Sequence, residues 1–335
     1  MYYASNVAIP FHILEYVTRY LQRHSPFFNL TQGRNFIFTA NGDRGWCGIE
    51  PAAPEIHNSI KLSQFGQAPP LGQAGTHQTF TSPDFSFPEF AAEFDEADMR
   101  FENEVCYWPE KDVVIPAYFT GYWYTMESYS KVWKRDILPD GSITETRLED
   151  VEPRNYTMFF RGGSLPTMYY SGGVRQTLFK MFSKGGKYDP EGPNRRPDIM
   201  LLGRVHGYHY AQQHSKFCLA LYGFGFGVRL TEAMIAGCVP IIVQDHQYQP
   251  LWDVLPYEEF SLRVSRQDLH KIVDIVDAVT PEQLARLQTG VDRWHRAFVW
   301  RVEYMPAQLG GLAHNYTVIA IKRRILNMWS AMYHH

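Results

Sequence analysis

Short apolar runs and helical stripes alternate along the second half of the chain. Apolar positions at helical spacing predict helices over 174–182 and 228–236. Four apolar runs around them have the length of buried strands; they lie at 156–160, 198–202, 217–221 and 238–243. Strands that alternate with helices favour a parallel sheet with right-handed crossovers. We therefore predict a doubly wound α/β unit in this half, followed by a helix over 319–332.

The first half shows similar elements in a less regular order. Helical spacing over 11–23 precedes a buried strand at 35–40, and a second strand is expected at 111–116. A stretch of Gly, Pro, Gln, Thr and Ser at about 66–88 predicts an exposed loop insertion, and residues 138–142 predict a turn. Helix, strand and loop in this order indicate an α/β layer here as well.

Length and charge limit the kinds of protein. The 335 residues allow two domains of about 150 residues each, and the patterning is weakest near 125–153. We expect one domain at 1–150 and a second at 151–335. A net charge of −3 gives no basic footprint for a nucleic acid. No stretch approaches the roughly 20 apolar residues of a membrane span.

The chain has four cysteines and no CxxC pair, so a zinc site is not expected. An even count fits two disulfides or four buried thiols, and the pattern leaves both open. Cys218 and Cys238 flank the helix at 228–236, on neighbouring strands of the predicted sheet, while Cys47 and Cys106 belong to the first domain. Three glycosylation sequons favour a secretory compartment. They begin at Asn29, Asn155 and Asn315.

Three glycines alternate where the strand at 217–221 ends and the next helix begins. They are Gly223, Gly225 and Gly227, next to Tyr222. Glycines at such a place let a ligand approach the backbone, and the N–H groups of the helix start form an anion site. In open α/β sheets, ligands bind at this end of the strands. A diphosphate is one candidate ligand, and a flexible strand–helix turn without a ligand is the alternative.

Arg229 and Glu232 sharpen this prediction. They lie three residues apart, so they share one helix face near its start. A guanidinium neutralises phosphate oxygens through several donors, and a carboxylate accepts hydrogen bonds from two ribose hydroxyls. An ordinary intrahelical ion pair is the alternative. The segment is not a P-loop, because Val228 and Arg229 stand where Lys and Ser or Thr are needed. Gly237 is expected to end the helix.

The residues of this unit resemble the signature of the exostosin family (glycosyltransferase family 47). The matching strings are Ser215-Lys216-Phe217-Cys218-Leu219, Gly223, Arg229-Leu230, Glu232-Ala233 and Gly237-Cys238-Val239-Pro240-Ile241-Ile242. The resemblance continues at 245, 250, 255 and 260–261. Upstream positions resemble the plant and algal branch; they are 33–38, 43–45, 47, 61–62, 65–66, 106, 111–116, 154 and 159–162.

The resemblance implies a GT-B architecture, in which two Rossmann-like domains face a cleft. It implies inverting transfer of a sugar from a nucleotide donor, usually a UDP-sugar, to a glycan or cell-wall polysaccharide. No catalytic metal and no cofactor beyond the UDP-sugar co-substrate are implied. Arg229 and Glu232 become the diphosphate and ribose contacts, and Arg161 with Gly162 becomes a second phosphate loop. The family's members are type II membrane proteins of the Golgi, so the full-length form is expected in the Golgi lumen.

The chain departs from the family pattern at four points. The loop after the strand lacks the usual Pro and the Ser before Arg229, and Gln64 replaces a family-like His. Met1 falls inside the acceptor-side domain, which is therefore expected to be incomplete. These departures keep a second hypothesis open, a catalytically silent partner in a hetero-complex with another glycosyltransferase. A generic phosphate-binding α/β protein is the third.

Inverting transfer needs a base within hydrogen-bond reach of the acceptor hydroxyl. Asp43 is the preferred candidate because it follows a predicted strand of the first domain, and an Asp that caps its own turn is the alternative. Asp245, after the strand at 238–243, is the second candidate. His206, His209 and His214 lie near the predicted cleft. The pair His206 and His209 lacks a third identifiable ligand, so we expect no metal site.

Overall fold

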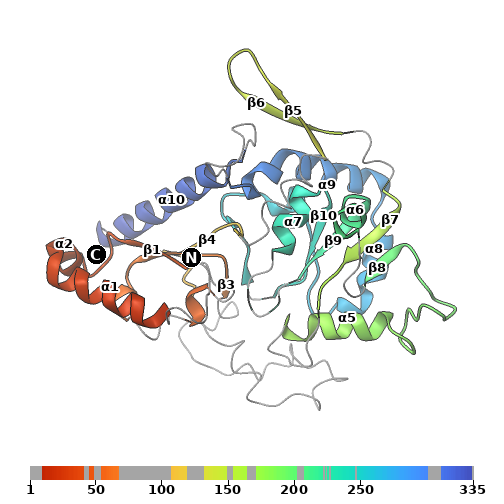
Figure 1. Ribbon diagram of the computed structural model, residues 1–335, viewed down its shortest axis with the longest axis horizontal. Helices are drawn as coiled ribbons and strands as arrows, with labels where there is room; N and C mark the ends of the chain where they lie inside the picture. The colour runs from red at the N-terminus through yellow and green to blue at the C-terminus, as the bar shows by residue number, and fades with distance from the viewer. Residues whose placement is uncertain are drawn as a thin grey trace.

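The computed structural model describes residues 10–40, 45–48, 54–67, 107–118, 132–148, 154–163, 171–201, 207–221, 223, 225, 228–245, 247–300 and 311–333. Its described part contains two separate parallel sheets, one of five strands and one of three, with helices packed around them (Figure 1). The α/β class predicted from the sequence is confirmed.

The larger sheet has the strand order β12-β10-β9-β7-β8, and all neighbouring strands are parallel. Its strands are β7 (Tyr156–Phe160), β8 (Ile199–Leu201), β9 (Ser215–Ala220), β10 (Val239–Ile242) and β12 (Leu262–Arg263). The first strand along the chain, β7, lies between β8 and β9, so the order reverses between β7 and β9. Ligands of doubly wound sheets bind at the carboxyl ends of the strands beside such a reversal.

Helices cover both faces of the larger sheet. Successive side chains of a strand point to opposite faces. Phe160 therefore shares a core with α5 (Val174–Phe182) and α8 (Ile272–Asp277), while Phe159 packs with α6 (Tyr208–Gln213) and α7 (Arg229–Ile235). Burial on both faces explains why β10 is apolar throughout.

Helix α9 (Pro281–Trp294) was not predicted, and neither were α6 and α8. The signal for α9 is a capping box in which the Thr280 side chain accepts from the Gln283 backbone and the Gln283 side chain accepts from the Thr280 backbone. The described residues also form six short 3-10 helices. They are η1 (Gly45–Gly48), η3 (Pro54–Ile56), η7 (Ser171–Gly173), η8 (Tyr257–Glu259), η9 (Leu269–Lys271) and η10 (His295–Phe298).

The smaller sheet has the order β1-β2-β4 and is also parallel. Its strands are β1 (Ile37–Ala40), β2 (Ile60–Ser63) and β4 (Val113–Val114). They follow α1 (Pro10–His24) and α2 (Pro26–Thr31), and α2 begins where the Ser25 side chain accepts from the Phe28 backbone. A separate core of Phe28, Ala40, Trp46, Ile56 and Phe65 lies beside this sheet.

Several contacts join the two sheets. Strand β3 (Gly66–Gln67) pairs antiparallel with β11 (Gln247–Tyr248), and the N–H of Leu251 donates to the Val114 carbonyl at 2.8 Å. Helix α10 (Ala313–Tyr333) returns toward the smaller sheet, where Arg324 Nε donates to the Asp112 carbonyl at 2.9 Å (Figure 1).

One pocket lies between the two sheets. Residues that follow β2, β4 and β10, together with the first turn of α7, line it. The carboxyl edges of both sheets therefore border the same pocket. Two parallel β-sheets with helices around them border this pocket, in the GT-B arrangement that the family resemblance implies.

A hairpin of β5 (Trp133–Ile137) and β6 (Ile143–Arg147) forms a separate two-stranded sheet that projects away from the helices beside the larger sheet, as Figure 1 shows. It turns at Gly141, within the predicted turn. Its base is fixed to the helices: Trp133 Nε1 donates to the Ile235 carbonyl at 2.8 Å, and Arg147 Nη1 donates to the Gly237 carbonyl at 2.9 Å.

Two sequence predictions remain predictions. The insertion at about 66–88 lies outside the described residues except for its start at β3. The division into domains 1–150 and 151–335 also stays a prediction. Within the described ranges, no helix is both long and apolar enough to cross a membrane.

Candidate functional site

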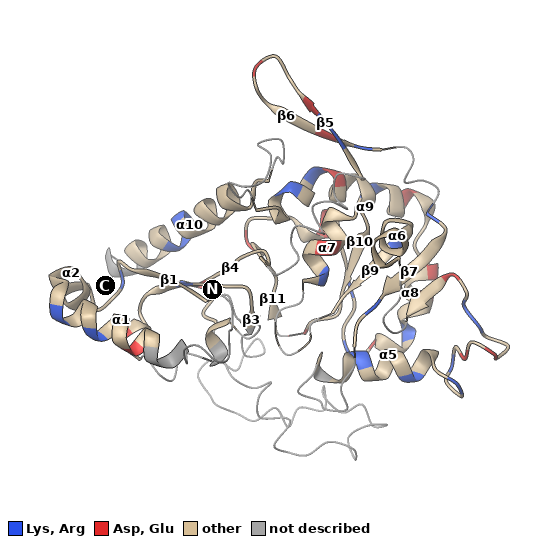
Figure 2. Ribbon diagram, viewed as in Figure 1, with Lys and Arg blue, Asp and Glu red and all other residues tan. Residues whose placement is uncertain are grey.

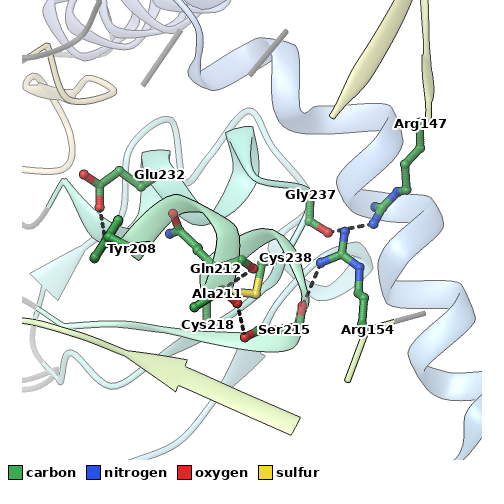
Figure 3. The surroundings of a disulfide bond; sticks show 10 residues. All are labelled: Arg147, Arg154, Tyr208, Ala211, Gln212, Ser215, Cys218, Glu232, Gly237 and Cys238. Atoms are coloured by element: carbon green, nitrogen blue, oxygen red, sulfur yellow. Dashed lines mark hydrogen bonds between the residues drawn. A yellow bond between two sulfur atoms is a disulfide. The ribbon is translucent and has the colours of Figure 1, made fainter. Parts of the chain in front are cut away.

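A disulfide joins Cys218 in β9 to Cys238, immediately before β10 (Figure 3). Of the two alternatives open from the sequence, disulfide or thiols, the structure has the disulfide. It links two positions 20 residues apart, and the segment between them contains the glycine loop and α7. The pairing considered for Cys47 and Cys106 lies outside what the structure describes.

The loops after β7 and β9 are fastened to each other. Arg175, near the start of α5, donates from Nη1 to the Gly163 carbonyl at 2.9 Å and from Nη2 to the Leu221 carbonyl at 3.2 Å. The backbone N–H of Ser171 donates to the Gly223 carbonyl at 2.7 Å. These bonds give the two strand ends beside the sheet reversal a fixed spacing.

Arg161 is the first residue after β7. Its Nε and Nη1 atoms are buried, and neither has a hydrogen-bond partner among the described residues. A buried donor without an acceptor costs about 1–3 kcal/mol, and more when the group is charged. A guanidinium in this state is prepared for an anion that brings its own oxygen acceptors.

Gly162 keeps this corner compact. A Cβ atom on Gly162 would lie 3.0 Å from Cζ of Phe160 and 3.2 Å from Nη1 of Arg175. Since a side chain there would push against the guanidinium that fastens the two loops, the position favours glycine. Arg161 and Gly162 thus lie at the carboxyl end of β7, where the family resemblance implies a second phosphate loop.

Arg229 and Glu232 share one helix face, as their spacing predicted, and they form the intrahelical ion pair that was the alternative to ligand contacts. Arg229 Nη1 lies 2.6 Å from Oε2 of Glu232, near the start of α7. In Figure 2 the blue and red segments of α7 mark this pair. Burial tends to lower the pKa of Arg229, but the charge of Glu232 and the phenol of Tyr208 raise it in sum, so the guanidinium stays charged.

Tyr208, on α6, completes this cluster and was missed by the sequence analysis. Its hydroxyl donates to Oε2 of Glu232 at 2.8 Å and accepts from Nη1 of Arg229. The Arg229 guanidinium also lies 5.1 Å from the centre of the Tyr208 ring. Burial raises the pKa of Tyr208 well above its usual value of 10, so the phenol keeps its proton. Among the described residues, Oε1 of Glu232 has no hydrogen-bond partner.

The glycine loop is described only in part. Gly223 and Gly225 are within the described residues, and Tyr222 and Gly227 lie outside them. Gly237 has φ = +66° and follows the end of α7, as predicted. Figure 3 places Gly237 beside Arg147 and Arg154, at the end of α7 away from Glu232.

Of the two candidate bases, only Asp245 lies within the described residues. Its Oδ2 accepts from the backbone N–H of Arg266 at 2.8 Å and lies 3.9 Å from Nε of the same residue. This carboxylate thus braces the loop after β12 at the carboxyl edge of the sheet. Asp43 and His206 lie outside the described residues. In the described part, no group of three or more His, Cys, Asp or Glu side chains could hold a metal ion.

Comparison with known proteins gives one matching family. The Exostosin GT47 domain matches residues 4–279. A rice (Oryza sativa subsp. japonica) protein described as a probable glucuronosyltransferase is 25% identical over 283 residues, covering 82% of this chain and 54% of its own. An Arabidopsis thaliana protein described as a probable beta-1,4-xylosyltransferase is 24% identical over 270 residues, covering 78% of this chain and 52% of its own. The chain thus spans about half the length of these relatives.

Among solved structures, the GtfA/B complex is similar with a TM-score of 0.35 and 13% identity, over 93% of this chain and 60% of that one.

Proposed function

Because the chain belongs to the exostosin GT47 family, we propose that it is an inverting glycosyltransferase that moves a sugar from a UDP-sugar donor to a glycan or polysaccharide acceptor. The names of its plant relatives, a probable glucuronosyltransferase and a probable beta-1,4-xylosyltransferase, support transfer of a sugar. The proposal needs a place for a diphosphate, a ribose and an acceptor hydroxyl in the pocket region between the two sheets.

Two nitrogens of Arg161, Nε and Nη1, carry the proposal. They are buried and have no hydrogen-bond partner among the described residues, at the carboxyl end of β7 beside the point where the strand order reverses. A diphosphate supplies the oxygen acceptors that Nε and Nη1 lack, and charge-assisted bonds of this kind are about twice as strong as neutral ones. In the transfer step the same charge stabilises the leaving UDP.

The ribose contact is assigned to Glu232. One carboxylate oxygen is held by Arg229 and Tyr208, and the other has no partner among the described residues. An ionised carboxylate accepts several hydrogen bonds. Oε1 is therefore available to a ribose hydroxyl, while Arg229 and Tyr208 fix the orientation of the group. Arg229 also adds positive charge near the diphosphate.

Asp43 remains our first candidate for the base and Asp245 the second. The backbone bond of Asp245 to Arg266 leaves its other oxygen for an acceptor hydroxyl. We propose no metal and no cofactor, because Arg161 and Arg229 supply positive charge to the leaving diphosphate.

The disulfide between Cys218 and Cys238 supports an oxidising compartment, because such bonds persist in the secretory pathway and are rare in the cytosol. We propose the Golgi lumen, with a type II membrane anchor in the full-length form. The alternative of a catalytically silent subunit in a hetero-complex keeps the nucleotide site and loses only turnover.

A donor panel tests this proposal. The chain is incubated with UDP-glucose, UDP-galactose, UDP-xylose and UDP-glucuronate, with and without xylan oligosaccharides, and released UDP is measured. We expect release with one donor, loss of it in Arg229→Ala, and strong reduction in Asp43→Asn. UDP binding without release from any donor selects the silent-subunit alternative. Neither binding nor release would contradict both.

A further inference from the structure

The pocket between the two sheets is lined by four glutamines. Gln64 follows β2 of the smaller sheet, while Gln244, Gln247 and Gln249 follow β10 of the larger one. Its space for a water-sized group is about 20 Å³, and a cavity needs at least about 10–15 Å³ to hold one water molecule. The pocket thus has room for a single hydroxyl-sized group.

Gln64 presents an acceptor to this pocket. The residue is only 3% exposed, and its Nε2 donates to the Tyr118 carbonyl at 3.2 Å. That bond fixes the amide so that Oε1 is the free atom. Oε1 is buried and has no partner among the described residues, so it needs a donor that these residues do not provide.

On the opposite wall, hydrogen bonds fix two of the three glutamine amides. Gln244 Nε2 donates to the Ala220 carbonyl at 3.1 Å, and Gln249 Nε2 donates to Oε1 of Gln244 at 2.7 Å. Gln247 is 9% exposed, and its side-chain amide forms no hydrogen bond with the described residues. Among the described residues, amides with unused hydrogen-bonding capacity therefore lie on both sides of the pocket, Gln64 on one and Gln247 and Gln249 on the other.

We propose that this pocket binds one hydroxyl group of the donor sugar, held between Gln64 and Gln247. A hydroxyl can donate to Oε1 of Gln64 and accept from Nε2 of Gln247. A carboxylate accepts only, so it would face the Gln64 oxygen without a bond. The described residues that line the pocket carry no charge to compensate it.

The position of the pocket favours the donor sugar over the acceptor. Leu230 and Thr231 line it and directly follow Arg229, the proposed diphosphate contact. The sugar of a nucleotide donor is bonded to the distal phosphate, so it must lie next to that contact. This inference rests on the proposed function and names the residues that recognise the transferred sugar.

Paired titrations test the inference. The affinities for UDP and for the best-binding UDP-sugar of the donor panel are measured by calorimetry in the wild type, Gln64→Met and Gln247→Met. We expect both variants to bind UDP as the wild type does and to lose about tenfold in affinity for the UDP-sugar. Gln22→Met on the exposed face of α1 is the control and should change neither affinity.

Monodeoxy analogues of that UDP-sugar identify the hydroxyl. Removing the bound hydroxyl should weaken binding to the wild type and have little effect on Gln64→Met, because the two changes delete the same bond. If the affinity losses from the deoxy position and from Gln64→Met were additive for every analogue, the inference would be overturned and the nucleotide site would stay intact. Equal wild-type affinity for UDP and for all UDP-sugars would also overturn the inference alone. Absence of UDP binding would overturn the proposed function as well. Thermal unfolding of each variant verifies that it is folded.

Discussion

The hydroxyl of Tyr208 donates to Oε2 of Glu232 at 2.8 Å, and this bond joins α6 to the start of α7. Glu232 is thereby held from a second helix in addition to Arg229 on its own helix. A carboxylate fixed in this way loses little conformational freedom when a ribose binds. Tyr208 is thus a positioning residue of the proposed donor site.

Replacing Tyr208 by Phe tests this role. The variant keeps the ring over Arg229 and removes only the hydroxyl, so we expect a folded protein whose affinity for UDP is about three- to tenfold lower. Calorimetric titration with UDP measures the change. Tyr210→Phe, on the same helix but 61% exposed, should bind as the wild type does. Unchanged affinity in Tyr208→Phe would remove Tyr208 from the site.

Gly237 offers a test of the helix end. Its φ of +66° disfavours a side chain, and a Cβ would lie 3.0 Å from Nη2 of Arg154 and 3.2 Å from Cζ of Arg147. Gly141 in the hairpin turn has φ = +79°, but a Cβ there would have no atom within 4 Å. We expect Gly141→Ala to cost about 1–2 kcal/mol of unfolding free energy from the backbone alone, and Gly237→Ala to cost more.

Urea unfolding followed by circular dichroism compares these two variants. A larger midpoint shift for Gly237→Ala isolates the crowding by Arg147 and Arg154. Equal shifts would show that the arginines move aside without cost.

The disulfide supports a third prediction. A cross-link that closes a loop of this size stabilises a fold by about 3 kcal/mol, mainly by restricting the unfolded chain. In the absence of reductant, the double variant Cys218→Ala/Cys238→Ala should therefore unfold at a lower urea concentration than the wild type. Mass spectrometry of unreduced peptides provides the direct check, since the wild type should yield a Cys218–Cys238 peptide pair. Equal urea midpoints would contradict a stabilising role.

Asp198 predicts a dependence on acid. Two bonds from Arg196 hold the pKa of Asp198 down at about 2, against about 3.9 in an unfolded chain. Its contribution to stability is therefore complete above about pH 4 and disappears as the pH falls toward 2. Solvent screening reduces that contribution to about 1 kcal/mol.

Asp198→Asn should accordingly be less stable than the wild type at pH 6, and the difference should vanish near pH 2. Urea unfolding at the two pH values measures this. A difference of the same size at both would show that the ion pair is not its source.

Much of the larger sheet could be predicted because most residues of β7, β9 and β10 are buried. The strand at 156–160 and the helix at 174–182 have the predicted bounds, since apolar runs and a helical stripe mark them directly. Gly237 and the contact of Arg229 with Glu232 were also predictable, because both depend on local spacing. Local chemistry is visible in sequence when its partners are within one helical turn.

The remaining site residues depend on contacts between distant segments. Tyr208 lies 21 positions before Arg229 and reaches it only because α6 and α7 cover the same face of the sheet. Gln64 was noted only as a departure from the family pattern, and its role depends on the smaller sheet facing the larger one. The spacing of residues along the sequence does not predict contacts between such distant segments, because only the folded structure brings them together.

The central claim is that Arg161 binds the diphosphate of a UDP-sugar, and a titration with UDP tests it most directly. Calorimetry should show binding to the wild type and equal binding to Arg195→Ala, whose side chain is exposed. Arg161→Ala should bind at least about tenfold more weakly, since it loses a charge-assisted contact. Failure of UDP to bind the wild type, or equal affinity in Arg161→Ala, would contradict the account.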